Sequence, residues 1–138
     1  MKKTVCAVIL ILLVSTLPMQ VMAYDTDEIM PLYENINAIY ACLSIDESLG
    51  IATCTGRITA KGIHPVSVDV ILQIYENNDW DTLASWSAND TWSITCMEEH
   101  AVYSGYKYRV LVFGYVHDSN GRIIESGSAV HEVNYPKQ

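Results

Sequence analysis

Short runs in which apolar and polar residues alternate follow one another along the chain from Ile36 onward. The clearest run is Val66 to Tyr75, where every second residue is a valine, a leucine or an isoleucine. A period of two residues is typical of a β-strand with one buried face. The pattern predicts seven strands, over Ile36–Ile45, Ile51–Thr59, Val66–Tyr75, Trp80–Trp86, Thr91–Met97, Tyr106–Val116 and Arg122–Val133.

The segments between these runs are rich in residues that favour turns. Glu76 to Asp79 contains two consecutive asparagines, and His117 to Gly121 ends in Asn-Gly, the strongest short signal for a hairpin. No window after Asn35 shows an apolar stripe with the 3.6-residue period of a helix. Seven short strands therefore predict an all-β, immunoglobulin/fibronectin-like antiparallel β-sandwich, with a small closed barrel as the alternative.

The first residues predict a secretory signal peptide. Two lysines precede an apolar run from Val5 to Val14, and Val21-Met22-Ala23 fits a signal-peptidase cut after Ala23. The run is about half of the ~20 residues that span a bilayer, so a cleaved signal is favoured over a retained membrane anchor. We expect a signal peptide over 1–23, a flexible acidic segment over 24–35 and a β-sandwich domain over 36–138.

Loss of Lys2 and Lys3 with the signal peptide would change the formal charge of the chain from −8 to −10. Nucleic acid is a poor partner for such a surface, because phosphate contacts need Lys and Arg side chains. Acidity also keeps an exported protein soluble, so it needs no specific role. The expected product is secreted and has no membrane anchor after cleavage.

Motifs for catalysis or metal binding are missing from the sequence. It contains no Gly-x-Ser-x-Gly, no His-Glu-x-x-His and no Cys-x-x-Cys. Glu98-Glu99-His100 and the oxygen-rich segment Glu76 to Asp81 are explained more simply as solvated turns. We therefore expect no catalytic residue, no metal site and no cofactor. A small secreted hydrolase stays open as an alternative, because a Ser-His-Asp triad can assemble from distant residues.

Three cysteines, Cys42, Cys54 and Cys96, remain after loss of the signal peptide. Alternation turns Cys42 outward and places Cys54 and Cys96 on core faces of strands that share a sheet in an immunoglobulin-like order. Cys54 and Cys96 are therefore the favoured disulfide. A Cys42–Cys54 pair is the competing one, and three free thiols are the third possibility. An odd cysteine could join two chains, and an open edge strand could also form a dimer.

Tryptophans and tyrosines are the remaining candidates for function. They combine an apolar ring with a polar edge, which suits half-exposed sheet positions and ligand contact alike. Trp92 shares its parity with Ile94, which assigns it to the core. Trp80 and Trp86 are six residues apart and are predicted to share one face, beside Tyr75. These three form the predicted ligand-binding platform.

Several short motifs resemble a family of small exported proteins of Gram-positive bacteria that is described only as a domain of unknown function. The motifs are Gly105–Val110, Leu72–Gln73, Trp80, Ser85–Ser87 and Glu125–Gly127. The resemblance covers most of the predicted domain. It implies export and a β-sandwich in which a tyrosine near the start of the penultimate strand bonds back to its loop. It implies no activity and no catalytic residues.

Together these patterns predict a secreted, non-enzymatic β-sandwich module that binds an extracellular or cell-surface partner. The partner would be a protein or a glycan. A carbohydrate-binding module is the main alternative within binding, because exposed Trp and Tyr rings can stack on sugars.

Overall fold

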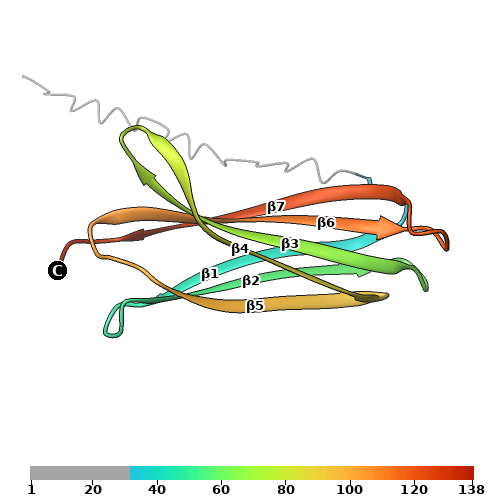
Figure 1. Ribbon diagram of the computed structural model, residues 1–138, viewed down its shortest axis with the longest axis horizontal. Coiled ribbons are helices and arrows are strands. Elements are labelled where there is room, and N and C mark those ends of the chain that lie inside the picture. The colour runs from blue at the N-terminus through green and yellow to red at the C-terminus, as the bar shows by residue number, and fades with distance from the viewer. Residues whose placement is uncertain (1–31) are drawn as a thin grey trace, which may run out of the picture. The chain divides into compact units, whose positions relative to one another are not determined.

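A computed structural model describes residues 32 to 138 of the chain (Figure 1). The predicted signal peptide and most of the predicted acidic segment lie outside the described residues. All seven predicted strands are present, and the described residues form no helix that could cross a membrane. The strands are β1 (Ile36–Asp46), β2 (Ile51–Ala60), β3 (Pro65–Glu76), β4 (Asp79–Thr91), β5 (Ser93–Ala101), β6 (Tyr106–His117) and β7 (Ile123–Tyr135).

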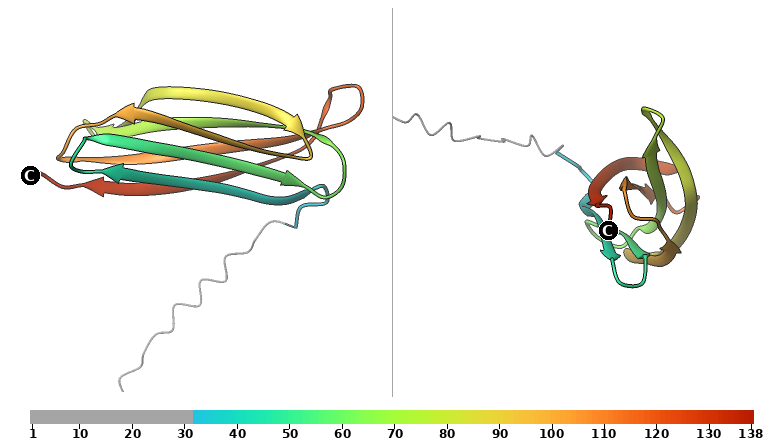
Figure 2. Two further views of the ribbon diagram at one scale, coloured as in Figure 1. Left: turned by 90° about the horizontal axis from the view of Figure 1, so that it is seen from below. Right: turned by 90° about the vertical axis from the view of Figure 1, so that its left-hand side faces the viewer.

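The strands form two antiparallel sheets, which confirms the immunoglobulin/fibronectin-like β-sandwich. One sheet has three strands in the order β1-β2-β5, and the other has four in the order β4-β3-β6-β7. The chain passes between the sheets after β2, β4 and β5, and the strands surround a common interior when seen end-on (Figure 2, right). Two distinct sheets rule out the closed barrel.

The core lies between the sheets and follows the predicted alternation most closely in β3 and β6. Both strands lie in the middle of the four-stranded sheet and bury every second side chain. Burial of one such aliphatic side chain contributes about 1.5–3 kcal/mol. The largest fully buried side chains are Tyr108, Ile36, Ile58, Leu72, Val66, Val68, Val70, Val110, Val112 and Val116.

Tyr108, near the start of β6, makes the tyrosine contact that the resemblance implied. Its ring is fully buried, and its hydroxyl bonds to the backbone five residues upstream. The Oη atom accepts from the Tyr103 N–H and donates to the Tyr103 carbonyl, both at 2.9 Å. Burial raises the pKa of the phenol, so the hydroxyl keeps the proton that it donates. The loop between β5 and β6 is thereby fixed to the core.

The last residues of the predicted flexible segment make hydrogen bonds to β7 and to Lys61. The Glu125 carboxylate on β7 accepts three successive backbone N–H groups, from Glu34, Asn35 and Ile36, at 2.6 to 2.7 Å. Lys61 also donates from Nζ to the Tyr33 carbonyl. Charge-assisted bonds of this kind are stronger than neutral ones, so they tie the residues just before β1 to the sandwich.

Trp92 is not in the core, because it forms the corner where the chain leaves β4 for β5. It has a left-handed backbone with φ of +76°, and its side chain is 52% exposed. Its N–H donates to the His64 carbonyl and its carbonyl accepts from the Ala60 N–H, both at 2.8 Å. The change of sheet at this residue breaks the alternation from which a buried position was predicted.

Candidate functional site

A β-bulge separates the three residues of the predicted binding platform. On β4, Thr82 pairs with Gln73 whereas Ala84 pairs with Leu72, so Leu83 is an extra residue between them. One extra residue reverses the alternation of the strand. Trp80 therefore lies on the outer face opposite Tyr75, and Trp86 lies on the inner face opposite buried Val70. The prediction that Trp80 and Trp86 share a face is wrong.

Trp86 packs at the margin of the core and not on a ligand platform. It is half-buried against the core cluster, and its ring packs in an edge-to-face arrangement with the His100 imidazole on β5, with centroids 6.4 Å apart. The two tryptophans therefore cannot present one flat surface to a polysaccharide, and the carbohydrate alternative loses one of its residues.

Trp80 is the centre of a different group on the outer face of the four-stranded sheet. The Tyr75 ring lies 5.1 Å from the Trp80 ring and is tilted by 54°. The Arg109 guanidinium carbon lies 4.2 Å from the Trp80 centroid, and the Lys107 Nζ lies 5.8 Å from it. Both distances are within the ~6 Å range of cation–π attraction. We call Gln73, Tyr75, Trp80, Lys107 and Arg109 the Trp80 cluster.

Cross-strand register brings this cluster together from three strands. Tyr75 on β3 pairs with Trp80 on β4 and with Lys107 on β6, and Gln73 pairs with Arg109. The tip of the β3–β4 hairpin, which carries Trp80, projects from one end of the sandwich (Figure 1). Two asparagines with positive φ, Asn77 at 53° and Asn78 at 61°, make the tight turn that fixes this register.

A hollow of about 270 Å³ adjoins the Trp80 cluster on the same face. Arg109, Ser128 and Glu132 form its polar lining, and its apolar lining comes from β6 and β7. An outward face of an antiparallel sheet is usually polar, so an apolar hollow there distinguishes this face. The apolar lining residues are Leu111, Phe113, Ala129 and Val130.

The predicted Cys54–Cys96 disulfide is absent, and the three cysteines between residues 32 and 138 are free. Cys54 and Cys96 share the core face as expected, but Cys54 pairs with Glu98 and Cys96 pairs with Gly56. Such diagonal neighbours are about 7–8 Å apart, beyond the usual span of a disulfide. Burial, with a smaller effect of Cys96, raises the pKa of Cys54 to about 12. Cys42 pairs with Thr55, which also separates the competing Cys42–Cys54 pair.

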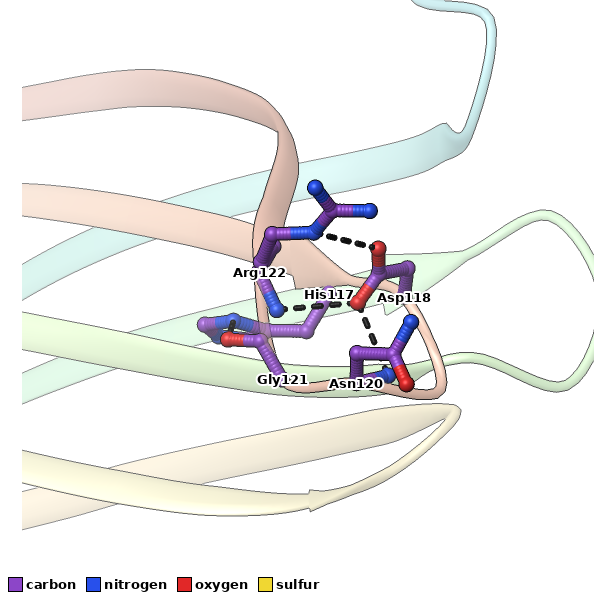
Figure 3. Close-up of polar contacts among 5 residues, drawn as sticks. All are labelled: His117, Asp118, Asn120, Gly121 and Arg122. Atoms are coloured by element: carbon purple, nitrogen blue, oxygen red, sulfur yellow. Dashed lines mark hydrogen bonds and ion pairs between the residues drawn. The ribbon is translucent and has the colours of Figure 1, made fainter.

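One serine–histidine pair bears on the hydrolase alternative. Ser67 Oγ lies 2.8 Å from His117 Nε2, and His117 Nδ1 lies 3.3 Å from the Gly121 carbonyl. The neighbouring Asp118 turns into the β6–β7 hairpin and accepts from the N–H groups of Asn120 and Arg122 and from Arg122 Nε (Figure 3). In the described part of the chain, the second imidazole nitrogen therefore faces a backbone carbonyl and not the carboxylate that a Ser-His-Asp triad requires.

Of the two acidic segments considered for metals, one takes a different position from the one expected and the other forms the predicted turn. Glu98 to His100 belongs to β5 and is not a loop, so successive side chains point to opposite faces. Glu76 to Asp81 forms the β3–β4 turn and the first residues of β4. Between residues 32 and 138, no three His, Cys, Asp or Glu side chains lie close enough together to hold a metal ion.

Sequence reasoning found Tyr75 and Trp80 but missed the two cations and Gln73. These residues are far apart in the chain and meet only through the register of β3 with β6. A signal was present, because Lys107 and Arg109 occupy the positions that alternate with buried Tyr108 and Val110. The outward residues of the predicted sixth strand could therefore have been identified from its alternation.

No protein-family model matches the sequence, and no curated protein matches it. The resemblance to an exported bacterial family therefore stays a prediction. Among solved structures, Spo0M, a sporulation control protein from Bacillus subtilis, is similar at 8% identity with a TM-score of 0.41. The match covers 72% of this chain and 49% of the Spo0M chain, so it spans about half of that structure.

Proposed function

We propose that this chain is a secreted, non-enzymatic β-sandwich module that binds an extracellular or cell-surface protein. The binding surface is the outer face of the four-stranded sheet, made of the Trp80 cluster and the adjoining hollow. The observation that carries the proposal is the stack of Arg109 on Trp80 beside an apolar hollow. Trp, Tyr and Arg are the residues most enriched among those that contribute most of the binding energy in protein interfaces.

The chemistry of this face favours a protein partner over a neutral sugar. Arg109 lies over the Trp80 ring at 4.2 Å, so part of the ring that would stack on a sugar is occupied. The hollow contains one aromatic ring, Phe113, with aliphatic residues on one side and polar residues, including Arg109, at its margin. Apolar cores with aromatic and Arg residues are typical of protein interfaces.

The experiment compares two matched substitutions on opposite sheets. Val130 on β7 and Met97 on β5 are outward apolar residues of edge strands, 56% and 61% exposed. The protein is expressed from its whole gene and crosslinked to the producing cells, and the captured protein is identified, purified and titrated. We expect Val130→Asp to weaken that purified complex at least about tenfold and Met97→Asp to leave it unchanged.

Two results would reject the proposal. One is equal affinity of Val130→Asp and the parent protein for the purified partner. The other is loss of binding in Met97→Asp alone, which would place the interface on the three-stranded sheet. Thermal unfolding of both variants shows that each is folded before binding is compared.

A further inference from the structure

Arg109 is held in one position by its neighbours on the sheet. Its Nε donates to Gln73 Oε1 at 2.8 Å, and Gln73 Nε2 donates in turn to Thr82 Oγ1 at 3.1 Å. The second bond fixes which end of the Gln73 amide faces Arg109. With the guanidinium stacked on Trp80, the side chain loses little further freedom when it binds a ligand.

The terminal nitrogens of Arg109 are left for a ligand. Glu132 lies directly opposite Arg109 in the β6–β7 register, but its carboxylate is bound by Lys107 Nζ at 2.7 Å. Within residues 32–138, the Arg109 guanidinium makes its hydrogen bond through Nε only. Arg109 therefore presents fixed donors of the geometry that holds a carboxylate with two parallel bonds.

The same guanidinium borders the apolar hollow, so one ligand can contact both. We propose that the partner presents an acidic peptide segment in which a carboxylate side chain stands next to an apolar one. The carboxylate binds Arg109, and the apolar side chain enters the hollow between Leu111, Phe113 and Val130. This inference rests on the proposed function and names the chemistry that the site recognises.

Charge supports an acidic ligand at this position. The chain carries 16 acidic and 8 basic residues in total. Two of the basic residues, Lys107 and Arg109, nevertheless lie together on this face with one carboxylate, Glu132, between them. An acidic partner would be repelled by most of this surface and attracted here, which favours correct docking.

The test uses small probes whose binding can be located on the protein. The isotope-labelled protein, expressed from the whole gene, is titrated by NMR with N-acetyl-leucyl-glutamate amide and with N-acetyl-leucyl-glutamine amide. We expect shifts at Arg109, Ala129 and Val130, and about fivefold tighter binding of the acid. Arg109→Lys keeps the charge but loses the two-pronged geometry and should reduce that preference; Arg57→Lys, on the outer face of β2, should not.

Each other outcome overturns the inference. Equal affinity for the acid and the amide probes would show that the site does not recognise a carboxylate. Chemical-shift changes confined to other strands would show that the probes bind elsewhere. Tighter binding of glucuronic acid than of the leucyl-glutamate probe assigns the site to acidic sugars. If Arg109→Lys leaves the purified partner's affinity unchanged while Val130→Asp abolishes it, this inference fails and the proposed binding face stands.

Discussion

The two sheets meet along two lines, which we call seams, and different interactions hold each seam together. At one seam β1 lies beside β7, and inward side chains of β7 bind backbone N–H groups at and before β1. Glu125 accepts three such groups, and His131 Nδ1 accepts the Leu43 N–H at 2.9 Å. At the other seam β4 lies beside β5, and the contact is the aromatic edge between Trp86 and His100.

The difference shows how unpaired strand edges are satisfied. A strand edge exposes N–H groups that need partners. At the β1–β7 seam these partners are side chains from the opposite sheet, so this seam depends on charge. At the β4–β5 seam the chain itself crosses through Trp92, and the backbone groups of Trp92 are paired with the β2–β3 region. This second seam depends on apolar packing and on one unusual backbone conformation.

The largest effect is expected from Trp86→Ala at the β4–β5 seam. The half-buried ring is replaced by a cavity beside Val70, which should lower the free energy of unfolding by about 2–4 kcal/mol. Urea denaturation followed by circular dichroism measures the loss. Trp80→Ala on the outer face is the control and should cost about 1 kcal/mol. Equal losses would show that the bulge does not separate the two rings.

Gly127→Val tests the packing of the β1–β7 seam. A Cβ atom at residue 127 would lie 2.5 Å from both Ile39 Cδ1 and Tyr33 Oη. Overpacking of this kind should lower the free energy of unfolding by about 1–3 kcal/mol. The neighbouring outward residue provides the control, Ser126→Val. A Gly127→Val protein as stable as the parent in denaturant titrations would mean that Ile39 and Tyr33 do not pack tightly against β7.

The charge at the β1–β7 seam should make stability depend on pH through Glu125. Desolvation alone would raise the pKa of this carboxyl, but the bonds from Glu34, Asn35 and Ile36 outweigh it and lower the pKa. The folded state therefore binds fewer protons than the unfolded state. The contribution is complete above the ordinary carboxyl pKa of about 4.3 and is lost as the pH falls through the lowered value.

Glu125→Gln should therefore have a lower melting temperature than the parent at pH 7, and the gap should shrink by pH 3. Differential scanning calorimetry at both pH values measures it. Glu99→Gln, on the outer face of β5, is the control. A difference in melting temperature between Glu125→Gln and the parent that does not change with pH would contradict a role for the Glu125 charge in stability.

The smallest effect is expected at the β4–β5 corner. A bulky residue at φ of +76° is strained, and asparagine adopts this region more readily. Trp92→Asn should therefore keep the melting temperature or raise it by an amount equivalent to about 1 kcal/mol. Trp92→Val should be less stable than Trp92→Asn by a similar amount. If valine is the better residue, the left-handed corner is not present in solution.

The strands could be predicted because regular alternation is a local property. Ile39, Ala41 and Ile45 pack against the core and Leu43 is buried, as their parity predicted, because β1 is regular along this stretch. The predicted hairpin at His117 to Gly121 is also present, since Asp118 and Gly121 carry their own turn chemistry. These features depend on residues that are close in sequence.

The site was only half predictable because it depends on events that alternation does not encode. A bulge is one extra residue whose position is set by the partner strand, so the parity of Trp80 relative to Trp86 could not be read from β4 alone. The exit of the chain from the sheet at Trp92 is a tertiary event of the same kind. Arg109 contacts Trp80 only because β6 lies next to β3 in the sheet, and the strand order is not visible in the alternation of a single strand.

The bulge at Leu83 gives the β3–β4 hairpin one residue that its register does not need. Removing Leu83 would leave the pairs on either side of the bulge as consecutive pairs of a regular ladder. Trp80 would stay opposite Tyr75 on the outer face, and β4 beyond Ala84 would keep its register. A one-codon deletion at this position should therefore leave the surface intact, whereas the same deletion inside a regular strand such as β3 would turn every later side chain of that strand to the other face.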